Sequence, residues 1–231
     1  MKITWLTQGS FMFESSEARI LVDPYMSDCL EAKGVKRMVP YPLAYEELKP
    51  DMLICTHDHL DHLDPETVEN IAAMYPDCVM AGPVSCCNHF KELGVEESRI
   101  QLLEEGTTVS FKDVTITPVL ALHSDPEAVG VVIEADGKKV YLSGDSEYDE
   151  KLVTEQTKGC DAILICINGR LGNMTLEQAL DVVKAAKPFT ALPMHYGLFA
   201  ENTADPQPFI DGCQAAGIKS FEMELGKANI I

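Results

Sequence analysis

The segment 57–62 carries the residues most suited to chemistry, because it reads His-Asp-His-Leu-Asp-His. Three imidazoles and two carboxylates in six residues are atypical of a protein core, where each would need a buried partner. His57 and His59 lie two residues apart, so on an extended backbone both side chains can reach one metal ion. A helical turn after them would bring Asp61 and His62 toward a second ion, about 3.5–4 Å from the first and joined to it by a bridging hydroxide. A charged, solvated turn that binds no metal is the alternative interpretation.

Three later residues are placed where they could complete such a site. His123, Asp145 and His195 each follow an apolar, strand-like segment. Loops at the ends of strands are where folds of mixed helices and strands commonly place their catalytic groups. The remaining histidine, His89, falls within a predicted helix that begins at Val84, and we expect it to be an exposed or capping residue.

The hydrophobic pattern predicts the elements that position these residues. Short strand-like runs joined by tight turns fill residues 2–22 and 107–142, whereas strands alternate with helices over 51–94 and 162–223. Two halves with the same progression predict an α+β fold of four layers in the order αββα, with two mixed β-sheets face to face and helices outside. No Ser/Gly-rich linker separates the halves, so residues 1–231 are predicted to form a single domain. The predicted helices span 45–48, 65–74, 84–93, 152–156, 176–186 and 207–216, and the last predicted strand spans 220–223.

The charge balance excludes several classes of partner. The chain has 18 Lys+Arg against 37 Asp+Glu, a net charge of −19. Such a surface repels phosphate backbones and anionic headgroups, so neither nucleic acid nor a membrane surface is an expected partner. A bound divalent metal can reverse the field locally, so a small anionic molecule fits as the substrate. A homo-oligomer is compatible with the sequence.

The N-terminal segment and the lack of a long apolar run predict a cytoplasmic protein with reduced cysteines. The first residues lack the basic and apolar regions of a signal peptide, and no apolar run approaches the roughly 18 residues of a transmembrane helix. The eight cysteines therefore read as reduced thiols, and several lie in apolar, core-like stretches. No Cys-x-x-Cys spacing occurs, so a cysteine zinc site or a thioredoxin-like redox motif has no support.

The string Thr-His-Asp-His-Leu-Asp-His over 56–62, followed by single His, Asp and His residues after later strands, resembles the metallo-β-lactamase-fold hydrolases. The resemblance spans nearly the whole chain. It implies seven metal ligands, namely His57, His59 and His123 for one ion, Asp61, His62 and His195 for the other, and Asp145 as a bridge between them.

Four further segments narrow the resemblance to one branch of that superfamily. Residues 11–14, 22–28, 167–170 and 193–197 are similar to the branch that contains L-ascorbate-6-phosphate lactonase. N-acyl-phosphatidylethanolamine phospholipase D is a more distant member of this branch. The resemblance therefore implies a lactone of the sugar-phosphate type, or a phosphodiester, as the kind of substrate.

These residues together predict a hydrolase with two divalent metal ions. Imidazoles and carboxylates suit Zn²⁺ or Mn²⁺, with Fe²⁺ also open. The ions would lower the pKa of a bridging water from about 15.7 toward 7, and the resulting hydroxide would attack a carbonyl carbon or phosphorus. Asp61 is the predicted catalytic residue that orients this hydroxide and handles its proton. The alternatives are a phosphodiesterase of the phospholipase D-like branch and a non-catalytic metal-binding protein.

Three residues are candidates for contacts with the substrate. Arg170 could hold a phosphate or carboxylate with two hydrogen bonds, although a surface ion pair explains it equally well. Asn168 and Tyr196 could donate hydrogen bonds to a developing oxyanion. The proline-rich segment 38–50 is either a lid over the site or an ordinary surface loop.

Overall fold

The structure is a computed structural model that describes residues 1–231 and contains two β-sheets. The first sheet has seven strands, in the spatial order β13 (Ala228–Ile230), β1 (Lys2–Thr7), β2 (Ser10–Glu14), β3 (Arg19–Val22), β4 (Met52–Ile54), β5 (Val79–Gly82) and β6 (Ile100–Leu102). Strands β13 to β3 pair antiparallel, and β3 to β6 pair parallel. The sheet is therefore mixed, as the sequence predicts.

The second sheet has six strands and is also mixed. Their spatial order is β12 (Thr190–Met194), β11 (Ala162–Cys166), β10 (Lys138–Leu142), β9 (Val129–Ala135), β8 (Val114–Leu120) and β7 (Val109–Phe111). Strands β10 to β12 pair parallel, and the others pair antiparallel. Asp136 and Gly137 both have positive φ between β9 and β10, which is what a two-residue hairpin turn requires.

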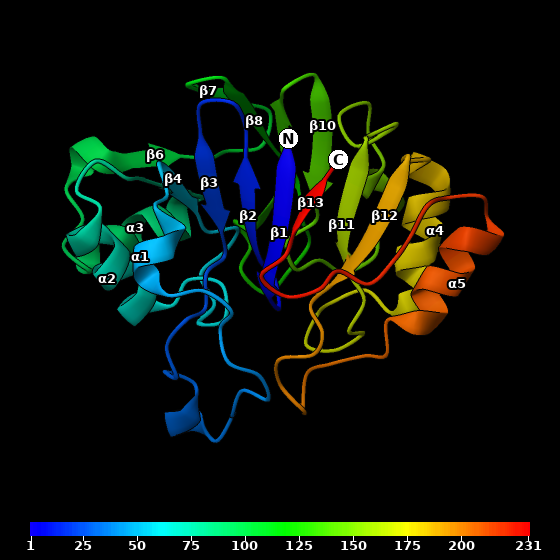
Figure 1. Ribbon diagram of the computed structural model, residues 1–231, viewed down its shortest axis with the longest axis horizontal. Helices are drawn as coiled ribbons and strands as arrows, with labels where there is room; N and C mark the ends of the chain where they lie inside the picture. Colours follow the sequence, from blue (N-terminus) through cyan, green and yellow to red (C-terminus); the bar gives the residue numbers. More distant parts are fainter.

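Helices cover the outer faces of both sheets. They are α1 (Tyr45–Leu48), α2 (Pro65–Met74), α3 (Val84–Glu92), α4 (Leu176–Ala186) and α5 (Gln207–Ala215), with short 3₁₀ helices η1 (Glu31–Lys33), η2 (Glu97–Arg99) and η3 (Glu150–Leu152). Figure 1 shows α1, α2 and α3 beside the first sheet and α4 and α5 beside the second. This arrangement confirms the predicted layered α+β architecture. None of the helices has the length and apolarity that crossing a membrane requires.

The strand β4 shows why its sequence is apolar throughout. Met52 and Ile54 belong to the core between the two sheets, whereas Leu53 packs with α2 and α3 on the outer face. Successive residues of a strand point to opposite faces, so a strand buried on both sides needs apolar residues at every position. The polar segment that follows at Thr56 is therefore fixed at the end of a rigid, fully buried element.

Two predicted elements are wrong. The segment 152–156 is no helix beyond the short η3, and residues 220–223 form no strand. The last strand is instead β13, which pairs with β1 at the other end of the chain. The sequence Ala-Asn-Ile of β13 is partly exposed and has no periodic pattern that would predict a strand. It is a strand because it pairs with a segment more than 220 positions away in the chain.

Candidate metal centre

Four strand ends bring all seven predicted ligands to one place. The segment 57–62 follows β4, His123 follows β8, Asp145 follows β10 and His195 follows β12. Their ligand atoms form three overlapping groups whose members lie within 4.8 Å of one another: His57, His59 and His123; His57, His62 and Asp145; Asp61, His62 and His195. The first and third groups have the composition that the resemblance implies, and Asp145 lies between them.

The first group brings ring nitrogens of three histidines to a common point. Nδ1 of His123 lies 3.3 Å from the carbonyl oxygen of Gly172 and donates to it, which leaves Nε2 free to accept. That Nε2 lies 3.1 Å from Nδ1 of His59. Nε2 of His57 is buried and has no partner in the protein. Burial lowers the pKa of His57 well below its usual range and lowers that of His59, so both rings are neutral at pH 7 and suited to bind a metal.

The charge of Asp145 dominates the surroundings of His62 and His195, which belong to the third group. Oδ2 of Asp145 lies 3.0 Å from Nε2 of His195, and its Oδ1 lies 3.4 Å from Nε2 of His62. Burial alone would lower the pKa of His195, but Asp145 and Asp61 together outweigh burial and raise it to about 9. The two Nε2 atoms lie only 3.3 Å apart, so a proton or a metal cation must separate their lone pairs.

These ligand atoms are suited to bind a divalent metal ion. Nε2 of His57 and Oδ1 of Asp145 are buried without hydrogen-bond partners, a state that costs free energy unless a cation satisfies them. The set offers only imidazole nitrogens and carboxylate oxygens, which suit Zn²⁺, Mn²⁺ or Fe²⁺.

Asp23 orients two of the histidines and was not predicted from the sequence as a site residue. It is fully buried at the end of β3, and its Oδ2 accepts hydrogen bonds from Nδ1 of His62 and Oγ1 of Thr56, both at 2.7 Å. Because the Thr56 hydroxyl donates to Asp23, Nδ1 of His57, 3.0 Å away, donates to that hydroxyl. Asp23 thus directs Nε2 of both rings toward the cluster. The available signal is its position directly after an apolar strand, similar to that of Asp145, which follows β10 three residues after its end.

The turn between β1 and β2 forms one side of the site. Nε2 of Gln8 lies 3.3 Å from Oδ2 of Asp61, and the carbonyl oxygen of Gln8 accepts from the backbone N–H of His195. A Cβ added at Gly9 would lie 2.9 Å from Cε1 of His62, so only glycine leaves room for that ring. Nothing in the dipeptide Gln-Gly predicts this role, because its contacts are made with distant segments.

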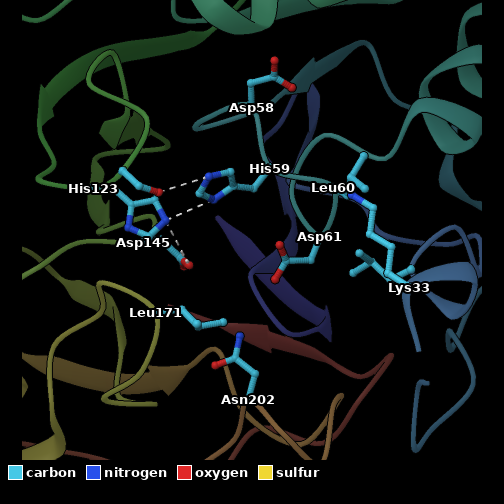
Figure 2. Close-up of a pocket in the computed structure, with 11 residues that line it drawn as sticks. Lys33, Asp58, His59, Leu60, Asp61, His123, Asp145, Leu171 and Asn202 are labelled. Atoms are coloured by element: carbon cyan, nitrogen blue, oxygen red, sulfur yellow. Dashed lines mark hydrogen bonds and ion pairs between the residues drawn. The ribbon is translucent and has the colours of Figure 1, made fainter. Parts of the chain in front are cut away.

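A cavity of about 510 Å³ gives access to the cluster. Figure 2 shows His59, Asp61, His123 and Asp145 around it, with Asn202 and Leu171 on the opposite side from Asp58. Lys33, from the segment around η1, also lines the cavity. None of residues 38–50 lines it, whereas Leu30 and Lys33 do, so of the two interpretations of 38–50 the structure favours a surface loop.

The three residues predicted to contact the substrate lie farther from the metal ligands than expected or face other cavities. Asn168 is buried behind the cavity, and Arg170 lines a neighbouring cavity of about 530 Å³. Tyr196 faces a third cavity, and its ring packs on Trp5 with centroids 4.8 Å apart. Both residues lie just beyond β12, and His195 has a positive φ of 65°, so the chain turns there and the ring of Tyr196 packs on Trp5 and not on the cluster. The structure therefore does not bring Tyr196 to the metal ligands.

The sixth histidine is closer to the site than expected. Nδ1 of His89 lies 2.7 Å from Oδ1 of Asp58, which stands between the first two predicted ligands. Both side chains are partly exposed, and His89 is not within the groups of candidate ligands.

Comparison with known proteins places the chain among metal-dependent hydrolases. Residues 18–196 match the family model for the beta-lactamase superfamily domain. A UPF0173 metal-dependent hydrolase of Methanosarcina mazei is 30% identical over 228 residues, which cover 93% of this chain and 91% of that protein. The metallo hydrolase Igni18 of Ignicoccus hospitalis superposes with a TM-score of 0.81 at 23% identity, covering 99% of this chain and 97% of that one. An isothiocyanate hydrolase from Delia radicum gut bacteria has the same fold, with a TM-score of 0.81 at 21% identity and coverage of 100% and 99%.

Proposed function

The chain belongs to the β-lactamase superfamily as one of its UPF0173 metal-dependent hydrolases, and on this basis we propose that it uses two divalent ions, Zn²⁺ or Mn²⁺, to hydrolyse a small anionic ester, lactone or phosphodiester. The observation that carries the proposal is the convergence of seven ligand atoms around buried acceptors without partners. Lactones of the sugar-phosphate type are the first substrates to test.

Two sets of residues would bind the two ions. His57, His59 and His123 would hold one ion, Asp61, His62 and His195 the other, and Asp145 would touch both. Bound divalent ions acidify a coordinated water and polarise the oxygen of the electrophile.

Asp61 is suited to orient the attacking water. It borders the cavity, and Gln8 holds its carboxylate through the contact at 3.3 Å. Burial would raise the pKa of Asp61, but His62 and His195 outweigh burial and hold it well below its usual range. A carboxylate with so low a pKa accepts a hydrogen bond from water and directs its lone pair, but it does not retain the proton.

The charges at the site favour an anionic substrate. The two carboxylates among the seven residues offset only half the charge of two divalent ions when the imidazoles are neutral. Lys33 and Asp58 also line the cavity, and their opposite charges offset each other. A local excess of positive charge can therefore attract an anion despite the net charge of −19 for the whole chain.

A chelation experiment tests the proposal. The purified protein is analysed for metals, stripped with a chelator, reloaded with Zn²⁺ or Mn²⁺, and assayed on a panel of lactones and phosphodiesters. We expect about two ions per chain, hydrolysis that disappears on stripping and returns on reloading, and a fold that persists without metal. Folded, fully loaded protein that hydrolyses nothing in the panel would support the non-catalytic alternative. The relative rates on the two substrate classes decide between lactonase and phosphodiesterase.

A further inference from the structure

A chain of three asparagines connects Asp145 to the wall of the cavity. Nδ2 of Asn173 donates to Oδ2 of Asp145 at 2.7 Å and to Oδ1 of Asn168 at 3.0 Å. Nδ2 of Asn168 then donates to Oδ1 of Asn202 at 2.7 Å. All three residues are at least nine-tenths buried, so the hydrogen bonds between them are shielded from bulk water.

The carboxylate of Asp145 fixes which group donates and which accepts in each hydrogen bond of this asparagine series. An ionised carboxylate can only accept hydrogen bonds, so the group that Asn173 turns toward Asp145 must be its NH₂. The second hydrogen of that NH₂ then points at the oxygen of Asn168, which leaves the NH₂ of Asn168 to face Asn202. The oxygen of Asn202 is consequently the atom that accepts. The NH₂ of Asn202 is therefore free to donate a hydrogen bond.

This last donor faces the cavity. Nδ2 of Asn202 has no hydrogen-bond partner in the protein and is not among the buried atoms that lack one. Figure 2 shows the Asn202 nitrogen on the cavity side of the residue, toward Asp61. The backbone N–H of Asn202 donates to the carbonyl oxygen of Phe199 at 3.1 Å, which holds the loop in place. The side chain is therefore fixed before any ligand binds.

We propose that Asn202 is a substrate-binding residue whose NH₂ donates a hydrogen bond to an anionic oxygen of the substrate, and that Asn168 is the positioning residue that sets its orientation. This inference rests on the proposed hydrolase function. Asn168 is thus assigned an indirect role in place of the direct oxyanion contact that its sequence position suggested.

The location of Asn202 indicates which part of the substrate it holds. Asn202 and Asp61 line both the cavity over the metal ligands and the neighbouring cavity of about 530 Å³. The neighbouring cavity is bordered by Val35, Phe199 and Arg170. Asn202 therefore stands at the junction, where the reacting end of a substrate in the first cavity would meet a substituent in the second.

Binding of inorganic phosphate to the zinc-loaded protein tests the proposal without requiring turnover. We expect calorimetry to show that Asn202→Ala binds phosphate at least about tenfold more weakly than the wild type, because it loses a hydrogen bond to a charged group. Asn202→Asp should bind more weakly still, because a carboxylate repels the anion. Asn70→Asp, an exposed change on α2, is the matched control and should bind like the wild type.

The outcomes separate this inference from the proposed function. Three results would each overturn the role of Asn202. The first is that Asn202→Ala binds phosphate with wild-type affinity, the second is that it binds weakly only because it has lost zinc, and the third is that the wild type binds no phosphate. If phosphate binding depends on Asn202 but no substrate is hydrolysed, the hydrolase proposal fails and the donor stands. If hydrolysis occurs and Asn202→Ala changes neither kcat/KM nor phosphate binding, only this inference fails.

The role of Asn168 is tested by a change that breaks one link of the chain. In Asn168→Asp the new carboxylate still accepts from Asn173 but cannot donate to Asn202. The amide of Asn202 should then turn its NH₂ toward that carboxylate and its oxygen toward the cavity, which weakens phosphate binding as much as Asn202→Ala. The double variant Asn168→Asp/Asn202→Ala should be no weaker than Asn202→Ala alone, because the two residues act through one donor. Additive losses, or loss of zinc in Asn168→Asp, would overturn the positioning role.

Discussion

Replacing Asp23 by asparagine should weaken metal binding, although Asp23 is not among the predicted ligands. Asp23→Asn keeps the shape of the side chain but replaces an acceptor with a donor. If its NH₂ occupies the position of Oδ2, it faces Nδ1 of His62 and the Thr56 hydroxyl. His62 must then accept at Nδ1, and the reoriented hydroxyl makes His57 accept at Nδ1 as well. Both rings would carry their proton on Nε2, the atom that must bind the ion.

The size of the effect follows from the hydrogen bonds that are lost. The contact between Asp23 and His62 is 2.7 Å long, and both side chains are fully buried, so solvent does not screen it. A hydrogen bond to a charged group contributes about 1.5–3 kcal/mol, which corresponds to a factor of roughly 10–100 in affinity. Changes of residues that orient metal-bound histidines have effects of about this size. We therefore expect zinc to bind about 10–100 times more weakly in Asp23→Asn.

Competition with a chelator of known zinc affinity measures this change, and elemental analysis after dialysis gives the stoichiometry. Asp113→Asn is the matched control, because Asp113 also accepts from a serine hydroxyl and a backbone N–H, those of Ser15 and Glu17, at 2.6 and 3.2 Å. The control should bind zinc like the wild type. If Asp23→Asn retained wild-type zinc affinity and two ions per chain, the argument from imidazole tautomers would be refuted.

Further changes test other parts of the site. His59→Ala should lose metal and hydrolysis together. His89→Ala, which removes only a partly exposed hydrogen bond to Asp58, should keep both and change the free energy of unfolding by less than about 1 kcal/mol. Elemental analysis and thermal denaturation check these two variants. Gly9→Ala should lower zinc affinity, because its Cβ would lie 2.9 Å from Cε1 of His62; zinc affinity equal to the wild type would contradict this. In metal-free protein the pKa of His195 is raised to about 9, so its stabilising contribution is complete below about pH 6.5 and is lost as the pH rises through 9. The Tm of stripped protein should fall between pH 7 and 9.5, and a flat profile would argue against a charged His195.

Local patterns of the sequence determine most of the fold and the set of candidate ligands. Strands such as β4 are recognisable because continuous burial requires continuous apolar residues, and the hairpin at Asp136-Gly137 is recognisable because its turn needs positive φ. The candidate ligands stand out because imidazoles and carboxylates at strand ends have no role in a core. These features depend on neighbours in the chain, which a sequence displays directly.

The tertiary structure alone decides which polar residues serve those ligands. The position of Asp23 after an apolar strand marks it only weakly in the sequence, and nothing marks Gln8. Both matter because strands β3 and β1 end beside the segment 57–62. The same holds for β13, whose three residues become a strand only by pairing with β1. It also holds for Tyr196, which the turn at His195 directs away from the site. The orientation of Asn202 depends on a carboxylate 57 positions earlier, through two intervening amides. Hydrogen bonds between distant segments leave no periodic or compositional trace, because each partner has the sequence context of an ordinary loop.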